Sequence, residues 1–131
     1  MRFARVIFGL AGVYGIGLIL PLYFEQAKYE RIAPPVITHP ELYYGFVGVT
    51  LAWQVAFLTV AAQPVRYRPI MIPAILEKFT YGMEVLVLGF QNRVAPVTMA
   101  FGTVDLVLGA LFVIAFVRVG STADRQINPT A

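Results

Sequence analysis

Three acidic side chains lie inside apolar stretches in the second half of the chain. Glu77 and Glu84 lie within residues 69–90, and Asp105 lies near the middle of residues 95–117. An ionised group at the depth of a membrane core is costly. Such a group is usually paired, turned toward the interior of a helix bundle, or part of a transport pathway. These acids are therefore the first candidates for a functional site.

Other polar residues accompany the acids at helical spacing. Within residues 69–90, Glu77 and Glu84 are seven apart and share a helix face with a threonine, while Lys78 and a tyrosine lie three apart on the adjoining face. A glutamine in the middle of residues 41–62 also needs a polar partner. Together these residues predict one intramembrane polar site, which consists of Gln54, Glu77, Lys78, Thr80, Tyr81, Glu84 and Asp105.

Depth along the helices predicts which acids are costliest. Depth is counted along the helix axis from the turn at Arg93, at about 1.5 Å per residue. It is ~14 Å for Glu84, ~18 Å for Asp105 and ~24 Å for Glu77. Glu84 and Asp105 are therefore expected as a pair near the middle of a ~30 Å hydrocarbon core. Lys78 is expected to pair with Asp105 or Glu77.

The acids allow two interpretations. Glu84 and Asp105 could form a midplane site for proton transfer or a polar ligand, with Glu77 connecting it to the cytoplasm. Alternatively, protonated acids and one ion pair could hydrogen-bond across helices and fix their register. We favour the structural interpretation slightly, because such contacts are common and no inverted repeat offers transport a second gate.

His39 and Glu41 are candidates on the outer surface. A histidine can bind a metal or titrate near neutral pH, but one beside Pro40 at a predicted helix start is better explained as an ordinary solvated side chain. Residues 38–41 also match a capping box, with Thr38 as N-cap and Glu41 reaching back. No spacing around His39 matches a known metal motif, so no metal site is predicted.

Composition sets the class of protein. Of 131 residues, 59% are hydrophobic and only 13% are charged, where soluble domains carry about 25% charged residues. The absence of cysteine excludes disulfides and thiol chemistry, and a single histidine excludes bis-histidine haem ligation within one chain. A net charge of +3 without a basic run argues against nucleic-acid binding. No nucleophile–base arrangement is visible, so an enzyme is not predicted and no cofactor is required.

Four segments are apolar and long enough to span a membrane as helices: residues 4–24, 41–62, 69–90 and 95–117. The short connections predict an antiparallel four-helix bundle, an all-α membrane protein in one domain, with Asn92 capping the fourth helix and a polar tail over 118–131. Gly102, Asp105 and Gly109 share one face, which should point at neighbouring helices.

The distribution of basic residues predicts the orientation. Six arginines fall on one side of the predicted spans and three basic residues fall on the other. The positive-inside bias then predicts that both termini and the turn between the second and third spans lie in the cytoplasm. The chain is thus expected to be a multi-pass protein of the bacterial inner membrane.

The layout resembles the DoxX-like group of small bacterial membrane proteins. The residues that carry this resemblance are Arg5 to Gly9, Glu41 to Gly45, and the basic turn of residues 66–68. The resemblance implies four helices and an accessory role, in some members beside quinone-linked redox complexes. The loop with Pro34 and Pro35 departs from the pattern.

We therefore expect an accessory or structural subunit of a larger bacterial membrane complex, because the chain has minimal loops, glycine-rich faces and no self-sufficient site. Its expected partners are membrane lipids and other membrane subunits, or further copies of the chain. The alternative is a small proton-coupled transporter, or a binding protein for a hydrophobic ligand such as a lipid or quinone, built on Glu84 and Asp105.

Overall fold

The computed structural model describes residues 1–32 and 37–127, and within these residues the chain forms helices and no strand. The all-α prediction is therefore confirmed for the described part. The elements, in chain order, are α1 (Arg2–Ile19), η1 (Leu20–Tyr23), α2 (Gln26–Ile32), α3 (Pro40–Ala62), η2 (Arg68–Ile70), α4 (Met71–Phe90) and α5 (Pro96–Ile127).

The last helix is longer than predicted. It continues to Ile127, well beyond the expected boundary at residue 117, so much of the polar tail is helical. No proline occurs between Pro96 and Ile127 to interrupt the helix. The Ser121 hydroxyl donates to the Val117 carbonyl at 3.1 Å, one turn back. The loop predicted over residues 25–40 likewise contains a short helix, α2, and its proline pair lies outside the described residues.

The predicted capping box at the start of α3 is wrong. His39, not Thr38, is the N-cap, and no side chain caps the helix. Pro40 occupies the first helical position, where its missing N–H costs nothing because that donor would have no helical partner. Glu41 instead reaches sideways, with Oε1 3.1 Å from Nδ1 of His39.

Asn92 ends α4 and does not begin α5, which corrects the second predicted cap. Its φ of 56° is left-handed, a conformation that asparagine tolerates better than most residues. The backbone N–H of Asn92 donates to the Gly89 carbonyl at 2.9 Å, and the backbone N–H of Arg93 donates to the Leu88 carbonyl at 2.9 Å. This paired pattern is a Schellman motif, which reverses the chain into the turn before α5.

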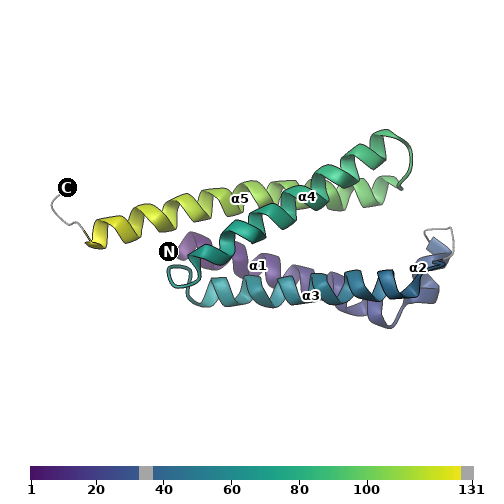
Figure 1. Ribbon diagram of the computed structural model, residues 1–131, viewed down its shortest axis with the longest axis horizontal. Coiled ribbons are helices and arrows are strands. Elements are labelled where there is room, and N and C mark those ends of the chain that lie inside the picture. Colours follow the sequence, from purple (N-terminus) through teal and green to yellow (C-terminus); the bar gives the residue numbers. More distant parts are fainter. Residues whose placement is uncertain (33–36, 128–131) are drawn as a thin grey trace.

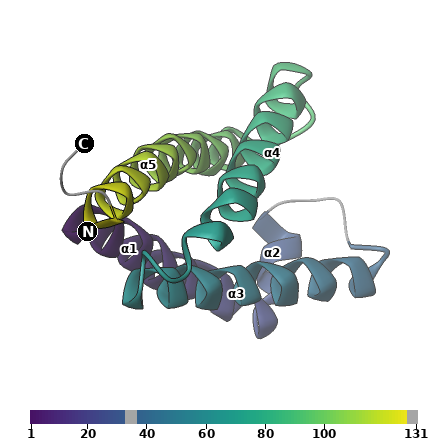
Figure 2. The ribbon, with the colours of Figure 1, turned by 60° about the vertical axis from the view of Figure 1, so that its left-hand side comes forward.

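The four long helices form two antiparallel hairpins, α1 with α3 and α4 with α5 (Figure 1). The hairpins meet near the N-terminus and the α3–α4 turn, and they diverge toward α2 and the α4–α5 turn (Figure 2). The predicted antiparallel pairing of the last two helices is thus confirmed. The molecule is narrow at one end and open between the hairpins toward the other.

Glycines allow close approach within each hairpin. A Cβ at Gly82 would lie 2.8 Å from the Gly102 carbonyl oxygen, and one at Gly12 would lie 2.8 Å from the Leu58 side chain. Gly109 meets Phe79 and the stem of Lys78 at 3.2–3.3 Å. The predicted face of Gly102, Asp105 and Gly109 therefore does point at a neighbouring helix, α4.

Three phenylalanines join the hairpins where they meet. Phe8, Phe57 and Phe112 come from α1, α3 and α5, and each is fully buried. The Phe8 and Phe112 rings stack with centroids 3.9 Å apart, and Phe57 meets Phe112 edge-on at 5.1 Å. Aromatic pairs of this kind add to the stabilisation that burial provides, so this cluster stabilises the contact between the two hairpins.

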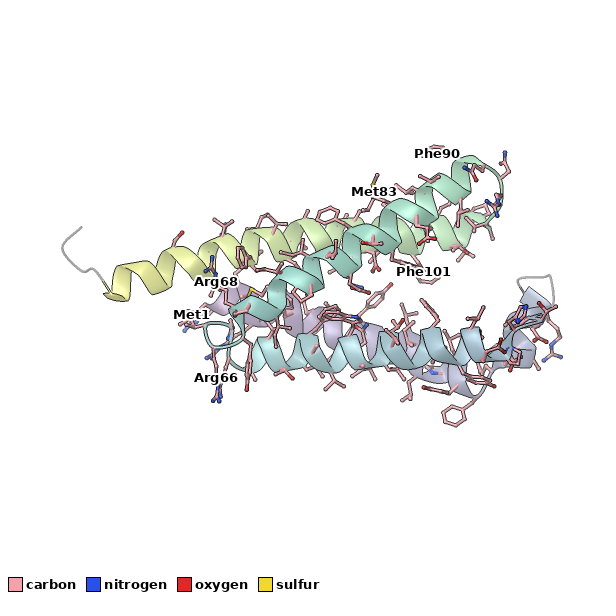
Figure 3. The ribbon with its side chains drawn as sticks, in the orientation of Figure 1. Met1, Arg66, Arg68, Met83, Phe90 and Phe101 are labelled. Carbon is pink, nitrogen blue, oxygen red and sulfur yellow. The ribbon has the colours of Figure 1, made fainter. Side chains whose placement is uncertain are left out.

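Within the described residues, three segments are long and apolar enough to cross a membrane: Arg2–Tyr23, Pro40–Ala62 and Pro96–Ser121. Outward-facing apolar side chains cover these helices and α4, including Leu10 at 64% exposure and Phe90 at 80% (Figure 3). Apolar surface on this scale indicates a membrane environment. α4 has 20 residues but carries Glu77, Lys78 and Glu84.

Candidate functional site

A cavity of about 460 Å³ lies between the two hairpins, and all four long helices line it. The residues of the predicted intramembrane polar site all contribute to its wall: Gln54, Glu77, Lys78, Thr80, Tyr81, Glu84 and Asp105. The sequence indicated only which of these residues share a face of one helix. The structure shows that faces of different helices line the same cavity.

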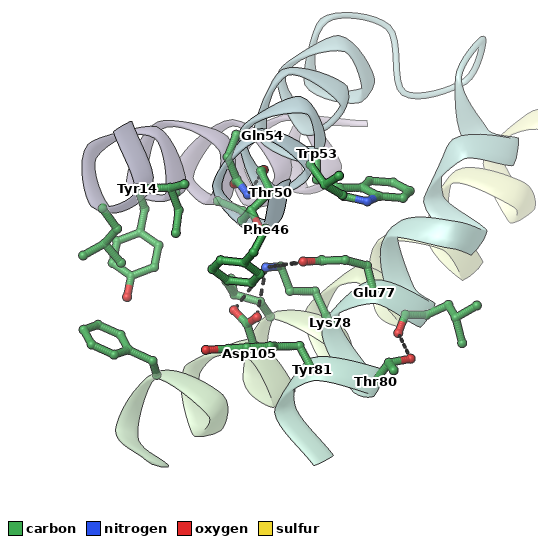
Figure 4. Close-up of a pocket in the computed structure, with 18 of the residues that line it drawn as sticks. Tyr14, Phe46, Thr50, Trp53, Gln54, Glu77, Lys78, Thr80, Tyr81 and Asp105 are labelled. Carbon is green, nitrogen blue, oxygen red and sulfur yellow. Dashed lines mark hydrogen bonds and ion pairs between the residues drawn. The ribbon is translucent and has the colours of Figure 1, made fainter. Parts of the chain in front are cut away.

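A buried lysine organises the polar end of the cavity. The Lys78 Nζ donates to Asp105 Oδ1 and Oδ2 at 3.1 and 3.2 Å, and to Glu77 Oε1 at 3.4 Å (Figure 4). The side chains are only 6% exposed for Lys78, 13% for Asp105 and 19% for Glu77. The predicted pairing of Lys78 is therefore present, and it involves both acids at once.

Packing directs the lysine toward α5. Gly109 lets the stem of Lys78 lie against the α5 backbone, and Asp105 stands about one turn earlier on the same face. The Phe57 ring lies beneath the ammonium, with Nζ 5.3 Å from the ring centroid. A ring face attracts a cation, so the ammonium is held by two carboxylates and one aromatic ring.

One carboxylate oxygen in this cluster lacks a hydrogen bond. Glu77 Oε2 is buried and accepts none, although it lies 3.3 Å from the Lys78 Nζ. The Lys78 ammonium instead donates hydrogen bonds to Glu77 Oε1 and to Asp105. A buried acceptor without a hydrogen bond typically costs about 1–3 kcal/mol. This oxygen can therefore accept a hydrogen bond from a further donor.

Glu84 and Asp105, the two acids predicted near the middle of the membrane, both line the cavity but differ in their contacts. Asp105 pairs with Lys78, whereas Glu84 is exposed at the cavity wall and makes no ion pair within the described residues. The predicted depths of these side chains along their helices allowed Asp105 to lie near either Glu84 or Lys78. An ammonium offsets the desolvation of a carboxylate, and a second carboxylate would repel it, so the lysine becomes the partner.

The side-chain amide of Gln54 finds a hydrogen-bond partner within its own helix, α3. It is 2% exposed, and its Nε2 donates to the Thr50 carbonyl at 2.9 Å. The amide end fits the notch left at Gly15, where a Cβ would collide with it. Thr80 likewise donates to the Leu76 carbonyl at 2.7 Å on α4.

Most of the aromatic side chains on the cavity wall were missed by sequence reasoning, which had predicted only Tyr81. They come from every long helix and are Tyr14, Phe46, Trp53 and Tyr81, which Figure 4 labels, together with Phe101. Phe46 stacks on Tyr81 across the α3–α4 gap, with centroids 6.2 Å apart. The seven-residue spacing of Phe46 and Trp53 was a readable sign that both occupy one face of α3.

The outer-surface candidates lie apart from the cavity. His39 and Glu41 are both 67% exposed and contact each other at the start of α3. Nearby, Tyr23 stacks on Tyr44 and the Tyr43 hydroxyl donates to the Leu22 carbonyl at 2.8 Å. Across residues 1–32 and 37–127, no three acidic or histidine side chains come together as a metal site.

Comparisons with protein-family models, with curated proteins and with solved structures found no match. The DoxX-like resemblance therefore stays an interpretation of short motifs.

Proposed function

We propose that this chain is a four-span membrane protein that binds a small amphiphilic molecule in its central cavity. Three helices qualify as spans by composition, and α4 is the fourth in this proposal. Its 20 residues extend about 30 Å, which matches a hydrocarbon core. Its charged residues, Glu77, Lys78 and Glu84, line the cavity. In this arrangement both termini are cytoplasmic in a bacterial inner membrane.

The observation that carries the binding role is the cavity itself. Its volume of about 460 Å³ falls within the usual range of ligand pockets, roughly 300–1,000 Å³. One end is polar, at Lys78, Glu77 and Asp105, and most of the remaining wall is apolar or aromatic. A pocket with this division suits a molecule with one polar group and an apolar body, such as a lipid or a quinone.

The predicted role as an accessory subunit stays a prediction, and we place ligand binding ahead of it. The accessory role was favoured partly because the sequence offered no self-sufficient site. The cavity weakens that premise, since residues from all four long helices of one chain line it.

Trp53 provides a direct test of binding. It is the only tryptophan of the chain and it lines the cavity. A short-chain benzoquinone, which quenches indole fluorescence on contact, should quench Trp53 saturably in detergent-free lipid nanodiscs. Val49→Phe, which puts bulk into the cavity, should weaken the apparent affinity by roughly fivefold or more, as overpacking usually costs 1–3 kcal/mol.

Val55→Phe is the matched control for that test. Val49 and Val55 are both on α3 and are 62% and 59% exposed, but only Val49 lines the cavity. Val55→Phe should leave the quenching curve unchanged. Quenching that never saturates, or that is identical in all three proteins, would mean that the quinone meets Trp53 only from the lipid.

A further inference from the structure

The cavity carries more acid than base. Among the described residues that line it, the acids are Glu77, Glu84 and Asp105, and Lys78 is the one base. That single ammonium is already shared by Glu77 and Asp105. Glu84 has no ion pair within the described chain. An occupant therefore meets an excess of carboxylate groups.

A second observation also points to a donor or a cation. Glu77 Oε2 is buried without a hydrogen bond, 3.3 Å from an ammonium that hydrogen-bonds Glu77 Oε1 and Asp105 instead. A donor or a positive charge placed near this oxygen would satisfy it, whereas a carboxylate or phosphate would be repelled.

The aromatic wall favours the same sign of charge. The rings of five aromatic residues line the space: Tyr14, Phe46, Trp53, Tyr81 and Phe101. Aromatic faces attract cations, most strongly where water is scarce. The protein already uses this effect beside the cavity, because Phe57 lies beneath the Lys78 ammonium.

We infer that the occupant is a lipophilic organic cation, such as a quaternary ammonium or phosphonium compound with aromatic or alkyl groups. This inference rests on the proposed function and specifies its ligand class. The positive centre lies toward Glu84 and the Glu77 and Asp105 carboxylates, and the apolar groups lie against the aromatic wall.

Two ions of matched size and shape but opposite charge provide the test. The protein in nanodiscs of neutral phosphatidylcholine is equilibrated with tetraphenylphosphonium or with tetraphenylborate, and binding to empty nanodiscs is subtracted. One uncompensated charge about 7 Å away at an effective dielectric constant of about 20 predicts at least a tenfold preference for the cation.

Glu84→Gln tests whether the acids cause this preference. Glu84 is outside the Lys78 ion pairs, so its removal should leave the fold intact while weakening tetraphenylphosphonium binding by about tenfold or more. Glu41→Gln is the control, since it removes the same charge from an exposed residue outside the cavity. It should leave binding unchanged. Equal binding to the Glu84→Gln and unaltered proteins would overturn the inference.

The outcomes separate this inference from the proposed function. If both ions bind equally, or the anion binds better, and Val49→Phe weakens both, then the cavity binds amphiphiles without preference for cations. The inference is then overturned and the proposed function stands. If neither ion binds and the quinone does not quench saturably, both are overturned.

Discussion

At the scale of single residues, Lys78 is the centre of the polar site. Its ammonium contacts two carboxylates that are both mostly buried. Removing it would leave Glu77 and Asp105 facing each other in an apolar setting. A buried charge that loses its partner is far costlier than an exposed one.

Lys78→Met should therefore lower the free energy of unfolding by about 3 kcal/mol. Lys28→Met is the control, because the Lys28–Glu25 pair is 58% and 45% exposed and such pairs contribute only about 0–1 kcal/mol. Unfolding by sodium dodecyl sulfate in mixed micelles, followed by circular dichroism, measures both. Equal stability of the two variants would show that the Lys78 cluster does not stabilise the fold.

At the scale of helices, the α4–α5 hairpin depends on glycine contacts. Gly82 approaches the backbone of α5 so closely that a Cβ would lie 2.8 Å from the Gly102 carbonyl oxygen. A backbone atom cannot move aside as a flexible side chain can. The hairpin in turn sets the position of Asp105 opposite Lys78, so helix packing determines the site geometry.

Gly82→Ala is expected to destabilise the protein by about 1–3 kcal/mol through overpacking. Gly17→Ala on α1, where a Cβ would meet nothing within 4 Å, should be neutral or stabilising by up to about 1 kcal/mol, because alanine is the better helix former. Thermal unfolding of both variants checks this contrast. If Gly82→Ala matched Gly17→Ala, the close α4–α5 contact would be wrong.

At the scale of the whole molecule, the proposed orientation requires α4 to cross the membrane. Arg66 and Arg68, in the turn before α4, lie at the end of the molecule with Met1 (Figure 3), and the α4–α5 turn lies at the other end (Figure 1). If α4 spans, its two flanking turns must be on opposite sides of the bilayer.

Single cysteines test this arrangement in a chain that has none of its own. Gln63→Cys and Gln91→Cys place a thiol in exposed positions before and after α4. A membrane-impermeant maleimide added to intact spheroplasts should label position 91 and not position 63, and both should react after lysis. Labelling of both positions in intact cells would contradict the fourth span.

Some features could be predicted from sequence because they depend on local pattern. Length and hydropathy located the four long helices but not α2, and the spacing of Gly102, Asp105 and Gly109 identified the face of α5 that meets α4. The cap predictions at Thr38 and Asn92 failed, because short cap motifs match many backbones and flanking residues decide which one forms.

By itself, then, the sequence determined that this is a helical membrane-type chain, and it singled out seven polar residues within the apolar segments as one site. The tertiary structure alone decided that these seven residues line one cavity, that Lys78 contacts Asp105 and Glu77 at once, and that aromatic rings complete the wall. The physical reason is that pairing depends on how each helix is rotated and tilted against its neighbours. Contacts such as Gly109 against Lys78 set those angles, and no single helix encodes them.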